Sequence, residues 1–522
     1  MTGPSIVLSF LLAGVASLLA ALAYAEFGVR FPRAGSAYSY TYYALGEITA
    51  FFVGWNLIME NVLSLAVVGR TCSAYANALT GGAIQNFTIS IFGEFHSSSA
   101  FLAPYPDVFA AILLASFLFF MMLGAKETSW LNNSLVAVNI TVMAIILGVG
   151  GYFADFSNWE YHEERGDPKP PGFINGFLPY GWAGVFAACA QCFFAYVGFD
   201  GIAAAGEEAK NPRKSIPIAT LITMAVVSTV YVSVAGVLTL MLPYYKISKE
   251  SGIPDALAHF HAYWAVYIVS GGAIASMVTV IMGTIFAVSR VLYAIAEDGL
   301  LPPMFRATFR KVPFVSMIVC TVGAASLAVF FNTDAIIEML SIGTLFAYLI
   351  VAYGMLVMRH SPMEDASTED DEKDQPRVAL RSWGYFLAPI YPLDMSHKKL
   401  VVMSLFVAAT SAFAFGFSIN SHLQWQVQIG FAVVFGSVIA LVCAYILPLR
   451  ELLQDDNYRM PLVPLLPIAS IALNAFLMTT MKTDTWYRFV VWLALGLLCY
   501  FGYGIRHSNL NRPQLQEDFD SS

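Results

Sequence analysis

The segment AYVGFDGIAAAGEEAKNP, residues 195–212, ends a long apolar run with features that disfavour one continuous helix. Gly198 weakens a helix interior, and Asp200 places a carboxylate next to a stretch suited to hydrocarbon. Membrane transporters use discontinuous helices because the freed backbone N–H and C=O groups bind substrate near the midplane. The pattern therefore predicts a helix broken at Gly198. The alternative is a capping glycine followed by an acid that reaches the membrane interface.

Long apolar runs recur along the whole chain, whose 522 residues are 58% hydrophobic and only 12% charged. Soluble proteins carry about twice this charged fraction, and a membrane helix needs about 20 apolar residues. The thirteen expected spans are 5–27, 48–68, 107–123, 133–153, 180–205, 216–241, 263–294, 313–331, 335–358, 399–418, 427–448, 461–480 and 485–505. The sequence therefore predicts an all-α polytopic membrane protein embedded in the lipid bilayer, with almost nothing left for a soluble domain.

Lysine and arginine are distributed unevenly between the two sides of these spans. Of the 27 in the chain, seven fall on one side and the remaining 20 on the other. The seven are Arg70, Arg165, Lys169, Lys246, Lys249, Lys482 and Arg488. Because cytoplasmic loops are rich in Lys and Arg, the side with 20 is predicted to be cytoplasmic. The sequon Asn86-Phe-Thr88 then lies outside, and Asn86 is the expected glycosylation site.

Several functional classes lack their residues in this chain. All eight histidines fall in loops or tails, which counts against membrane enzymes built on histidine clusters. No GxSxG, HExxH or phosphate-binding loop occurs, so no enzyme activity, cofactor, metal or nucleic-acid partner is expected. Cys189 and Cys192 form a CxxC within an apolar span, where small packing residues are the expected role.

Few charged residues lie within or at the ends of the predicted spans. The four candidates are Glu60 in mid-span, Asp200 at the predicted break, Glu26 at the end of the first span and Arg290 at a cytoplasmic end. Intramembrane charges are costly and therefore mark candidate functional sites. For Glu60, the alternatives are a carboxylate that binds substrate and an acid that pairs with a polar group between packed helices.

Five ordered stretches carry a family resemblance. They are AYAEFGVRFPRAGSAYSY (23–40), FFVGWNLIMEN (51–61), FFAYVGFDGIAAAGEEAKNPRKSIP (193–217), SRVLYAIAEDGLLP (289–302) and EMLSIGTLFAYLIVAYGMLVMRH (338–360). Through them, residues 1–360 resemble the cationic amino acid transporter family of the amino acid–polyamine–organocation superfamily. The resemblance implies a LeuT-like core of two inverted five-helix repeats with alternating access around one central site. Residues 399–505, which match in number and hydropathy only, are expected to form four accessory helices.

The resemblance also nominates residues for the substrate site. It implies a lining made by Phe194, Tyr196, Gly198, Phe199 and Asp200. Phe194 is expected to be an aromatic wall or gate, and the backbone of 197–199 is expected to face the α-amino group of an amino acid. Glu60 matches an acid found in bacterial and in some animal relatives. A carboxylate in that position favours arginine, lysine or ornithine as substrate.

Further positions follow from the same resemblance. Gly283 and Thr284 are additional candidates for the pocket, whereas Glu26 and Arg290 are expected at a cytoplasmic gate or in structural ion pairs. Asn139 stands where proton-coupled bacterial relatives carry a lysine, and asparagine does not titrate. The resemblance therefore implies ion-independent facilitated transport or exchange.

The expected location is the plasma membrane, with an endosomal or lysosomal membrane as the alternative. Two other functions remain open. One is transport of neutral or other amino acids in an internal membrane, and the other is a non-transporting membrane sensor or subunit. Uptake of labelled arginine compared with labelled leucine separates these hypotheses. A partner subunit is neither indicated nor excluded by the sequence.

The sequence departs from the family pattern at its start, where Met1 leads directly into the span 5–27. Family members place before it a broken helix whose glycine-rich turn binds the substrate carboxylate. We therefore expect the chain as written to lack that helix and to require it for uptake. Residues 361–398 are expected to form a disordered acidic cytoplasmic loop, and 506–522 a cytoplasmic tail.

Overall fold

A computed structural model describes most of the chain in side-chain detail. The described residues are 2–30, 37–95, 101–122, 129–163, 168–170, 172–204, 211–248, 251–308, 313–360, 397–420, 425–449 and 458–509. Within these ranges the regular structure is helical, apart from an isolated bridge between Leu102 and Phe331. The predicted all-α membrane fold is confirmed. The acidic segment 361–396 lies outside the described residues, and its predicted disorder stays a prediction.

The α-helices follow one another along the chain with short connections. Their bounds are α1 Ile6–Arg30, α2 Ala37–Leu45, α3 Glu47–Leu79, α4 Ala83–Phe92, α5 Val108–Met122, α6 Ser129–Tyr152, α7 Gly181–Cys192, α8 Asp200–Ala204, α9 Pro212–Met241, α10 Gly252–His259, α11 Tyr263–Glu297, α12 Phe314–Phe330, α13 Thr333–Arg359, α14 His397–Asn420, α15 Trp425–Ile446, α16 Leu465–Thr479, α17 Thr483–Cys499 and α18 Ile505–His507. Each of the thirteen predicted spans coincides with one of these helices or, at 180–205, with the pair α7 and α8.

Length and composition separate these helices into two groups. Among the described residues, ten helical segments are long and apolar enough to cross a membrane. The spans predicted at α5, α12 and α16 are shorter apolar helices. Helix α3 runs for 33 residues, well past the predicted end of its span at residue 68. Apolar length alone located the spans but did not locate the end of α3, because its last turns are amphipathic rather than apolar.

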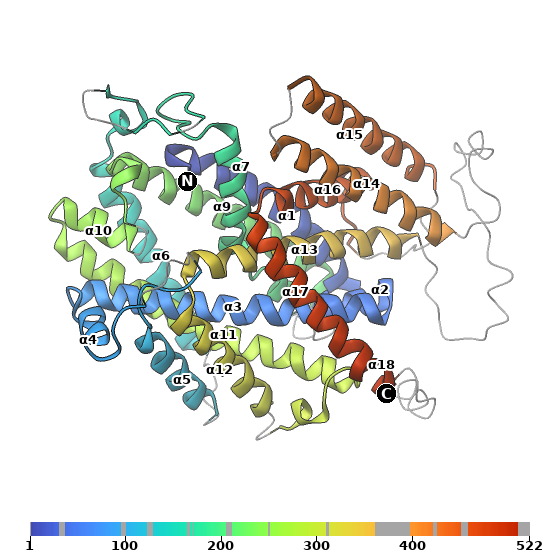
Figure 1. The fold of residues 1–522 in the computed structure, drawn as a ribbon, viewed down its shortest axis with the longest axis horizontal. Helices are drawn as coiled ribbons and strands as arrows, with labels where there is room; N and C mark the ends of the chain where they lie inside the picture. Colours follow the sequence, from blue (N-terminus) through green and yellow to red (C-terminus); the bar gives the residue numbers. More distant parts are fainter. Residues whose placement is uncertain are drawn as a thin grey trace.

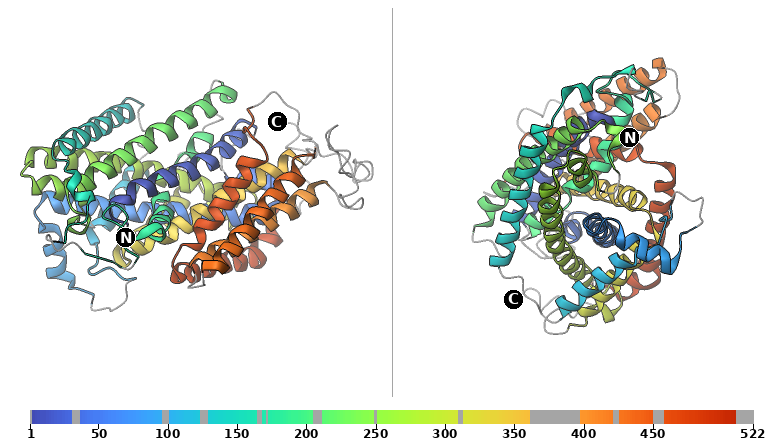
Figure 2. Two further views of the ribbon diagram at one scale, coloured as in Figure 1. Left: turned by 90° about the horizontal axis from the view of Figure 1, so that it is seen from above. Right: turned by 90° about the vertical axis from the view of Figure 1, so that its left-hand side faces the viewer.

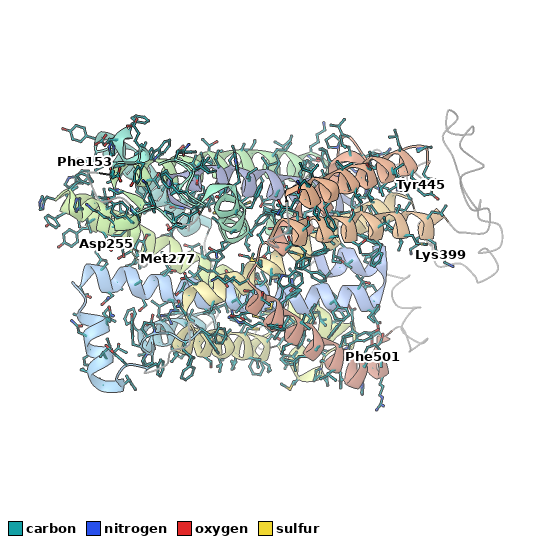
Figure 3. The ribbon with its side chains drawn as sticks, turned by 45° about the horizontal axis from the view of Figure 1, so that its top comes forward. Phe153, Asp255, Met277, Lys399, Tyr445 and Phe501 are labelled. Atoms are coloured by element: carbon teal, nitrogen blue, oxygen red, sulfur yellow. The ribbon has the colours of Figure 1, made fainter. Side chains whose placement is uncertain are left out.

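The long helices run roughly side by side, so the molecule has two distinct ends (Figures 1 and 2). Phe153 and Asp255, which the charge pattern places outside, lie at one end in Figure 3. Lys399, which it places on the cytoplasmic side, lies at the other end, together with Tyr445 and Phe501 near the inner ends of the predicted spans 427–448 and 485–505. The arrangement thus collects the predicted outer and inner loops at opposite ends, as alternating spans require.

Helices α3 and α13 form the centre of the bundle and are the most buried of the long helices. Helix α3 packs against α11 and α13, and α1 packs against α9, α7 and α13. The two halves of the broken helix, α7 and α8, both contact α1. These contacts place the break predicted near Gly198 beside the most buried helices of the molecule.

Helices α14, α15 and α16 form a second packed group against the inner half of α13. Tyr353 on α13 donates a hydrogen bond to the carbonyl of Val402 on α14 at 2.8 Å. Helix α17 packs against both α13 and α3, and Trp55 Nε1 of α3 donates to the carbonyl of Trp492 at 3.0 Å. The helices after residue 396 therefore support α3 and α13 from outside. Their assignment as a separate accessory unit stays a prediction.

Candidate substrate site

The helix predicted to break at Gly198 is discontinuous in the structure. Helix α7 ends at Cys192 and continues as a 3₁₀ turn over Phe193–Tyr196, and α8 begins at Asp200. Between them Val197 is extended, and Gly198 has φ +121°. L-residues rarely adopt that backbone conformation, whereas glycine adopts it without strain. Gly198 therefore permits the change of direction between the two half-helices.

The backbone at the break is open and lacks its usual hydrogen bonds. Gly198 is exposed, and a Cβ added to it would meet nothing within 4 Å. Among the described residues, no backbone partner accepts from the N–H of Gly198 or Phe199, and none donates to the carbonyl of Val197. Such free donors and acceptors can bind the polar groups of a small ligand.

Four aromatic side chains surround the inner side of the break. Tyr24 on α1 contacts Phe199 edge to face at 5.5 Å between ring centroids and Tyr348 on α13 at 5.9 Å. Phe199 and Phe193 in turn pack on Tyr348 at 5.1 and 6.2 Å. All four residues are buried. This aromatic group joins α1, the broken helix and α13.

Two carboxylates lie next to these aromatic rings. Glu60 on α3 is 5% exposed, and its buried Oε2 atom has no hydrogen-bond partner among the described residues. Asp200, the first residue of α8, is near enough to interact electrostatically with Glu60 and with Tyr24. The hydroxyl of Thr344 on α13 also lies beside Glu60. The structure therefore brings together Glu60 and Asp200, which are far apart in the sequence.

In the part of the chain that the structure describes, no cationic side chain forms an ion pair with Glu60. Among the described residues, the ion pairs with buried carboxylates involve Glu26 and Glu338 but not Glu60. A buried carboxylate without a positive partner is unfavourable, and aromatic rings attract cations through their negative faces. The combination of Glu60, Asp200 and the tyrosine rings is thus suited to a ligand that carries a positive charge.

The other residues nominated for the pocket have different surroundings. Phe194 is half-buried and packs against the main apolar core. Tyr196 points toward α1, where its hydroxyl donates to the carbonyl of Phe10 at 2.8 Å. On α11, Gly283 is exposed and Thr284 is half-buried, and no hydrogen bond among the described residues joins either of them to Glu60. Their proposed contact with substrate stays a prediction.

Glu26 is the centre of a buried ionic cluster near the cytoplasmic end. Its Oε1 atom accepts from Arg359 Nε at 2.8 Å and lies 3.0 Å from Arg30 Nη2. Its Oε2 atom accepts from Arg359 Nη2 at 2.5 Å and from the backbone N–H of Met460 at 2.7 Å. Glu26 is fully buried, and Arg359 is 3% exposed. The cluster joins α1 to the end of α13 and to the segment before α16.

Arg290, to which the sequence analysis gave the same expected role as Glu26, has different surroundings. It is exposed, and its guanidinium carbon lies 4.0 Å from the centroid of the Phe286 ring on the same helix. It forms no ion pair with any residue in the described ranges. Asn139 is exposed on α6, and Asn86 is exposed on α4, where glycosylation stays a prediction.

The cytoplasmic end holds a second set of polar contacts, which the sequence did not indicate. The Tyr38 hydroxyl of α2 donates to Asp298, at the end of α11, and Tyr500 donates to Glu47 of α3 at 2.9 Å. Burial raises the pKa of the Asp298 carboxyl, while the Tyr38 hydrogen bond acts in the opposite direction. The backbone N–H of Asn509 also donates to the backbone carbonyl of Asp298, at 3.1 Å.

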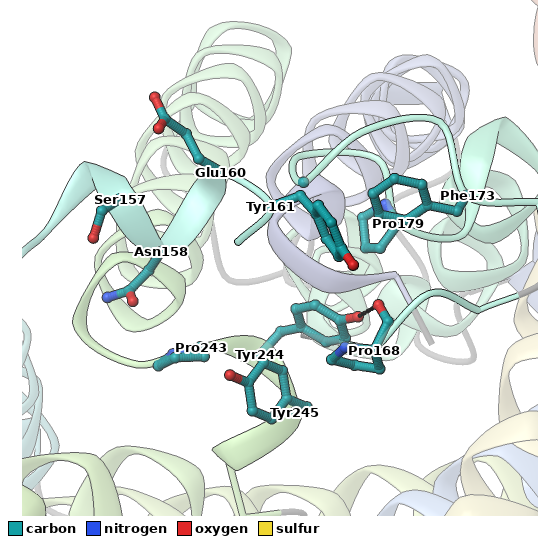
Figure 4. A pocket seen from close by; sticks show the side chains of 11 residues that line it. Ser157, Asn158, Glu160, Tyr161, Pro168, Phe173, Pro179, Pro243, Tyr244 and Tyr245 are labelled. Carbon is teal, nitrogen blue, oxygen red and sulfur yellow. Dashed lines mark hydrogen bonds between the residues drawn. The ribbon is translucent and has the colours of Figure 1, made fainter. Parts of the chain in front are cut away.

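Two cavities near the outer end are poor candidates for the substrate site. One, in the outer loops, is lined by Tyr161, Tyr244 and Tyr245 and has a volume of about 20 Å³ (Figure 4). That volume accommodates roughly one water molecule. The other measures about 440 Å³, opens between α6 and α11, and is lined by Tyr152, Phe260 and other residues that include no carboxylate, lysine or arginine. Neither includes Glu60 or Gly198.

The fold and the site define a polytopic helical membrane protein with a negatively charged, aromatic-lined site at a helix break. Residues 1–419 match the family described as "Amino acid permease", and residues 458–508 match "C-terminus of AA_permease". "Cationic amino acid transporter 4" of Mus musculus is 37% identical across 98% of this chain and 84% of its own length. The protein of the same name in Homo sapiens is 36% identical, covering 99% and 84%. The chain belongs to the amino acid permease family, in its cationic amino acid transporter branch.

A plant relative extends the comparison. "Cationic amino acid transporter 2, vacuolar" of Arabidopsis thaliana is 30% identical across 98% of this chain and 85% of its own length. The similarity therefore covers both the core containing the broken helix and the later helices, α14 to α17. Membership of a family of integral membrane transporters agrees with the apolar helices of the structure.

Proposed function

We infer that this protein transports cationic amino acids, namely arginine, lysine and ornithine, across a membrane. The observation that carries the proposal is the buried carboxylate of Glu60, which lies close to Asp200 and has one oxygen without a hydrogen-bond partner in the described ranges. The names of the animal relatives support the same substrate class. Membership of a transporter family also supports a role other than enzymatic catalysis.

The chemistry of the site divides the substrate between two regions. The N–H groups of Gly198 and Phe199 and the carbonyl of Val197 have no backbone partner among the described residues, and they are suited to the α-carboxylate and α-amino groups. The positive side chain is then placed between Glu60, Asp200 and the ring of Tyr24 or Tyr348. One pair of opposite charges 4 Å apart contributes about 4 kcal/mol at an effective dielectric constant near 20. That difference is enough to favour arginine strongly over leucine.

Transport is proposed to be ion-independent and to proceed by facilitated diffusion or exchange. The support is Asn139, which cannot gain or lose a proton at the position where the sequence resemblance places a lysine in proton-coupled relatives. The proposed location is the plasma membrane. The Arabidopsis relative named vacuolar makes an internal membrane the alternative to be tested.

The decisive experiment compares uptake of labelled arginine and labelled leucine by the wild-type protein and by Glu60→Gln. Both are tested as written and extended with the helix that family members place before residue 5, and each uptake is corrected for the amount of protein in the membrane. Glu160→Gln is the matched control, since Glu160 is an exposed acid of the outer loop region with the same charge. We expect Glu60→Gln to reduce arginine uptake at least tenfold and leucine uptake much less. The control should change neither.

Two further measurements complete the test. Arginine uptake should persist without sodium and in the presence of a protonophore, because the asparagine at position 139 does not titrate. Fluorescence microscopy of the tagged protein tests the plasma-membrane assignment. Equal losses of arginine and leucine uptake in Glu60→Gln would contradict the substrate role and leave Glu60 as a packing residue.

A further inference from the structure

A second buried carboxylate lies on α13, nearer the outer end than the proposed substrate site. The side chain of Glu338 is 4% exposed, and its Oε1 atom lies 2.5 Å from Nζ of Lys482. Oε2 accepts from the hydroxyl of Thr485 at 3.0 Å, and Nε2 of Gln191 donates to Oε1 at 3.4 Å. Gln191 belongs to α7, the outer half of the broken helix. The Glu338 carboxylate therefore contacts both the helix that breaks and the start of α17.

The two members of this ion pair differ in their exposure to water. The Lys482 side chain is 61% exposed and stands at the N-cap of α17. An ammonium on a flexible stem can leave such a contact at little cost, because water solvates it well. Glu338 cannot follow it, and removing the partner of a buried charge is strongly unfavourable. Departure of Lys482 therefore favours the arrival of another cation.

Polar groups continue from Glu338 along α13 toward Glu60. Ser341 follows one turn further in, and its buried hydroxyl has no hydrogen-bond partner among the described residues. Thr344 follows after three more residues and lies beside Glu60. With a rise of 1.5 Å per residue, Glu338 and Thr344 are about 9 Å apart along the helix axis. A buried row of polar side chains thus connects the outer carboxylate with the inner one.

We propose that Glu338 forms an outer subsite for the positively charged side chain of an arriving amino acid, and that Lys482 occupies it when no substrate is present. The ammonium or guanidinium group of the substrate displaces Lys482, pairs with Glu338 and then passes Ser341 and Thr344 to Glu60. The subsite rests on the proposed transport of cationic amino acids and adds an entry step to it. Because Gln191 of α7 donates to Glu338, binding of a cation at the subsite affects the outer half of the broken helix.

The test measures initial rates of arginine and leucine uptake from the outer side at several concentrations. Lys482→Gln removes the internal competitor, so KM for arginine should fall about threefold while KM for leucine stays unchanged. Glu338→Gln removes the subsite, so KM for arginine should rise at least fivefold and KM for leucine less than twofold. Lys246→Gln is the matched control, because Lys246 is an exposed outer lysine outside this contact.

The exchanged variant Glu338→Lys with Lys482→Glu separates a subsite from a structural ion pair. It restores the opposite charges but puts the positive one on α13, so arginine uptake should stay impaired while leucine uptake stays near the wild-type value. Full recovery of arginine uptake in this variant would overturn the proposal. A KM for arginine that is unchanged or raised in Lys482→Gln would also overturn the proposal. Misfolding would not explain that result, because Lys482 is exposed. Absence of arginine uptake both by the protein as written and by a version extended with the helix that family members place before residue 5 would instead refute the proposed function.

Discussion

Glu26→Gln is expected to destabilise the protein much more than removal of an exposed charge at its cytoplasmic end. The carboxylate is fully buried and pairs with two arginines, and it also accepts from the N–H of Met460. Glutamine keeps a similar volume but leaves the buried Arg359 without its two-pronged acceptor. Breaking a buried ion pair by removing one partner costs about 3–5 kcal/mol. Because the cluster joins α1, α13 and the segment before α16, loss of these contacts should lower the stability of the whole helix bundle.

The assay is thermal denaturation of the purified protein, followed as the fraction that remains monodisperse after heating. Arg290→Gln is the control, since Arg290 is exposed and its guanidinium lies over the ring of Phe286 on the same helix. Loss of such an exposed contact costs at most about 1 kcal/mol. The midpoint temperature of denaturation should therefore fall further in Glu26→Gln than in Arg290→Gln. Equal midpoints would refute the reasoning, because they would mean that the buried cluster contributes no net stability.

Two further predictions concern the helix break and the topology. Gly198→Ala should lower uptake with normal delivery to the membrane, because φ +121° costs an L-residue about 1–3 kcal/mol. Gly201→Ala is its control, since an added Cβ there also meets nothing within 4 Å but no positive φ is required; similar uptake in both variants would reduce Gly198 to a spacer. Asn86→Gln should abolish the shift in gel mobility that a glycosidase produces, and a glycan that persists would contradict the outer position of α4.

The break at Gly198 could be predicted because its signals are local. A glycine, an acid and the end of an apolar run occur within a few residues, and the structure places the discontinuity there. Glu60 was likewise conspicuous, since a carboxylate in an apolar span has few ordinary explanations. The aromatic partners were not predicted, because Tyr24 and Tyr348 are two among 26 tyrosines and nothing in their immediate sequence distinguishes them.

Glu26 and Glu338 show the same limit for ionic contacts. The sequence marked Glu26 as a gate or structural residue, but its main partner, Arg359, is 333 residues away. Glu338 lies within one of the family-like stretches, 338–360, but its immediate sequence indicates no role for it. Its partners Gln191 and Lys482 come from spans whose relative placement the sequence does not specify. Pairs of this kind become visible only when the helices are packed.

The sequence by itself determined which segments enter the membrane and where one of them breaks, because apolar length, glycine and charge act over a few neighbouring residues. It also predicted the side of the membrane on which each loop lies, through the uneven distribution of lysine and arginine. The tertiary structure alone decided which side chains share the space around the break. Membrane helices are apolar on nearly every face, so their hydrophobic pattern does not specify which helix packs on which. Only packing α1, α3, α8 and α13 together brings Tyr24, Glu60, Asp200 and Tyr348 into one site.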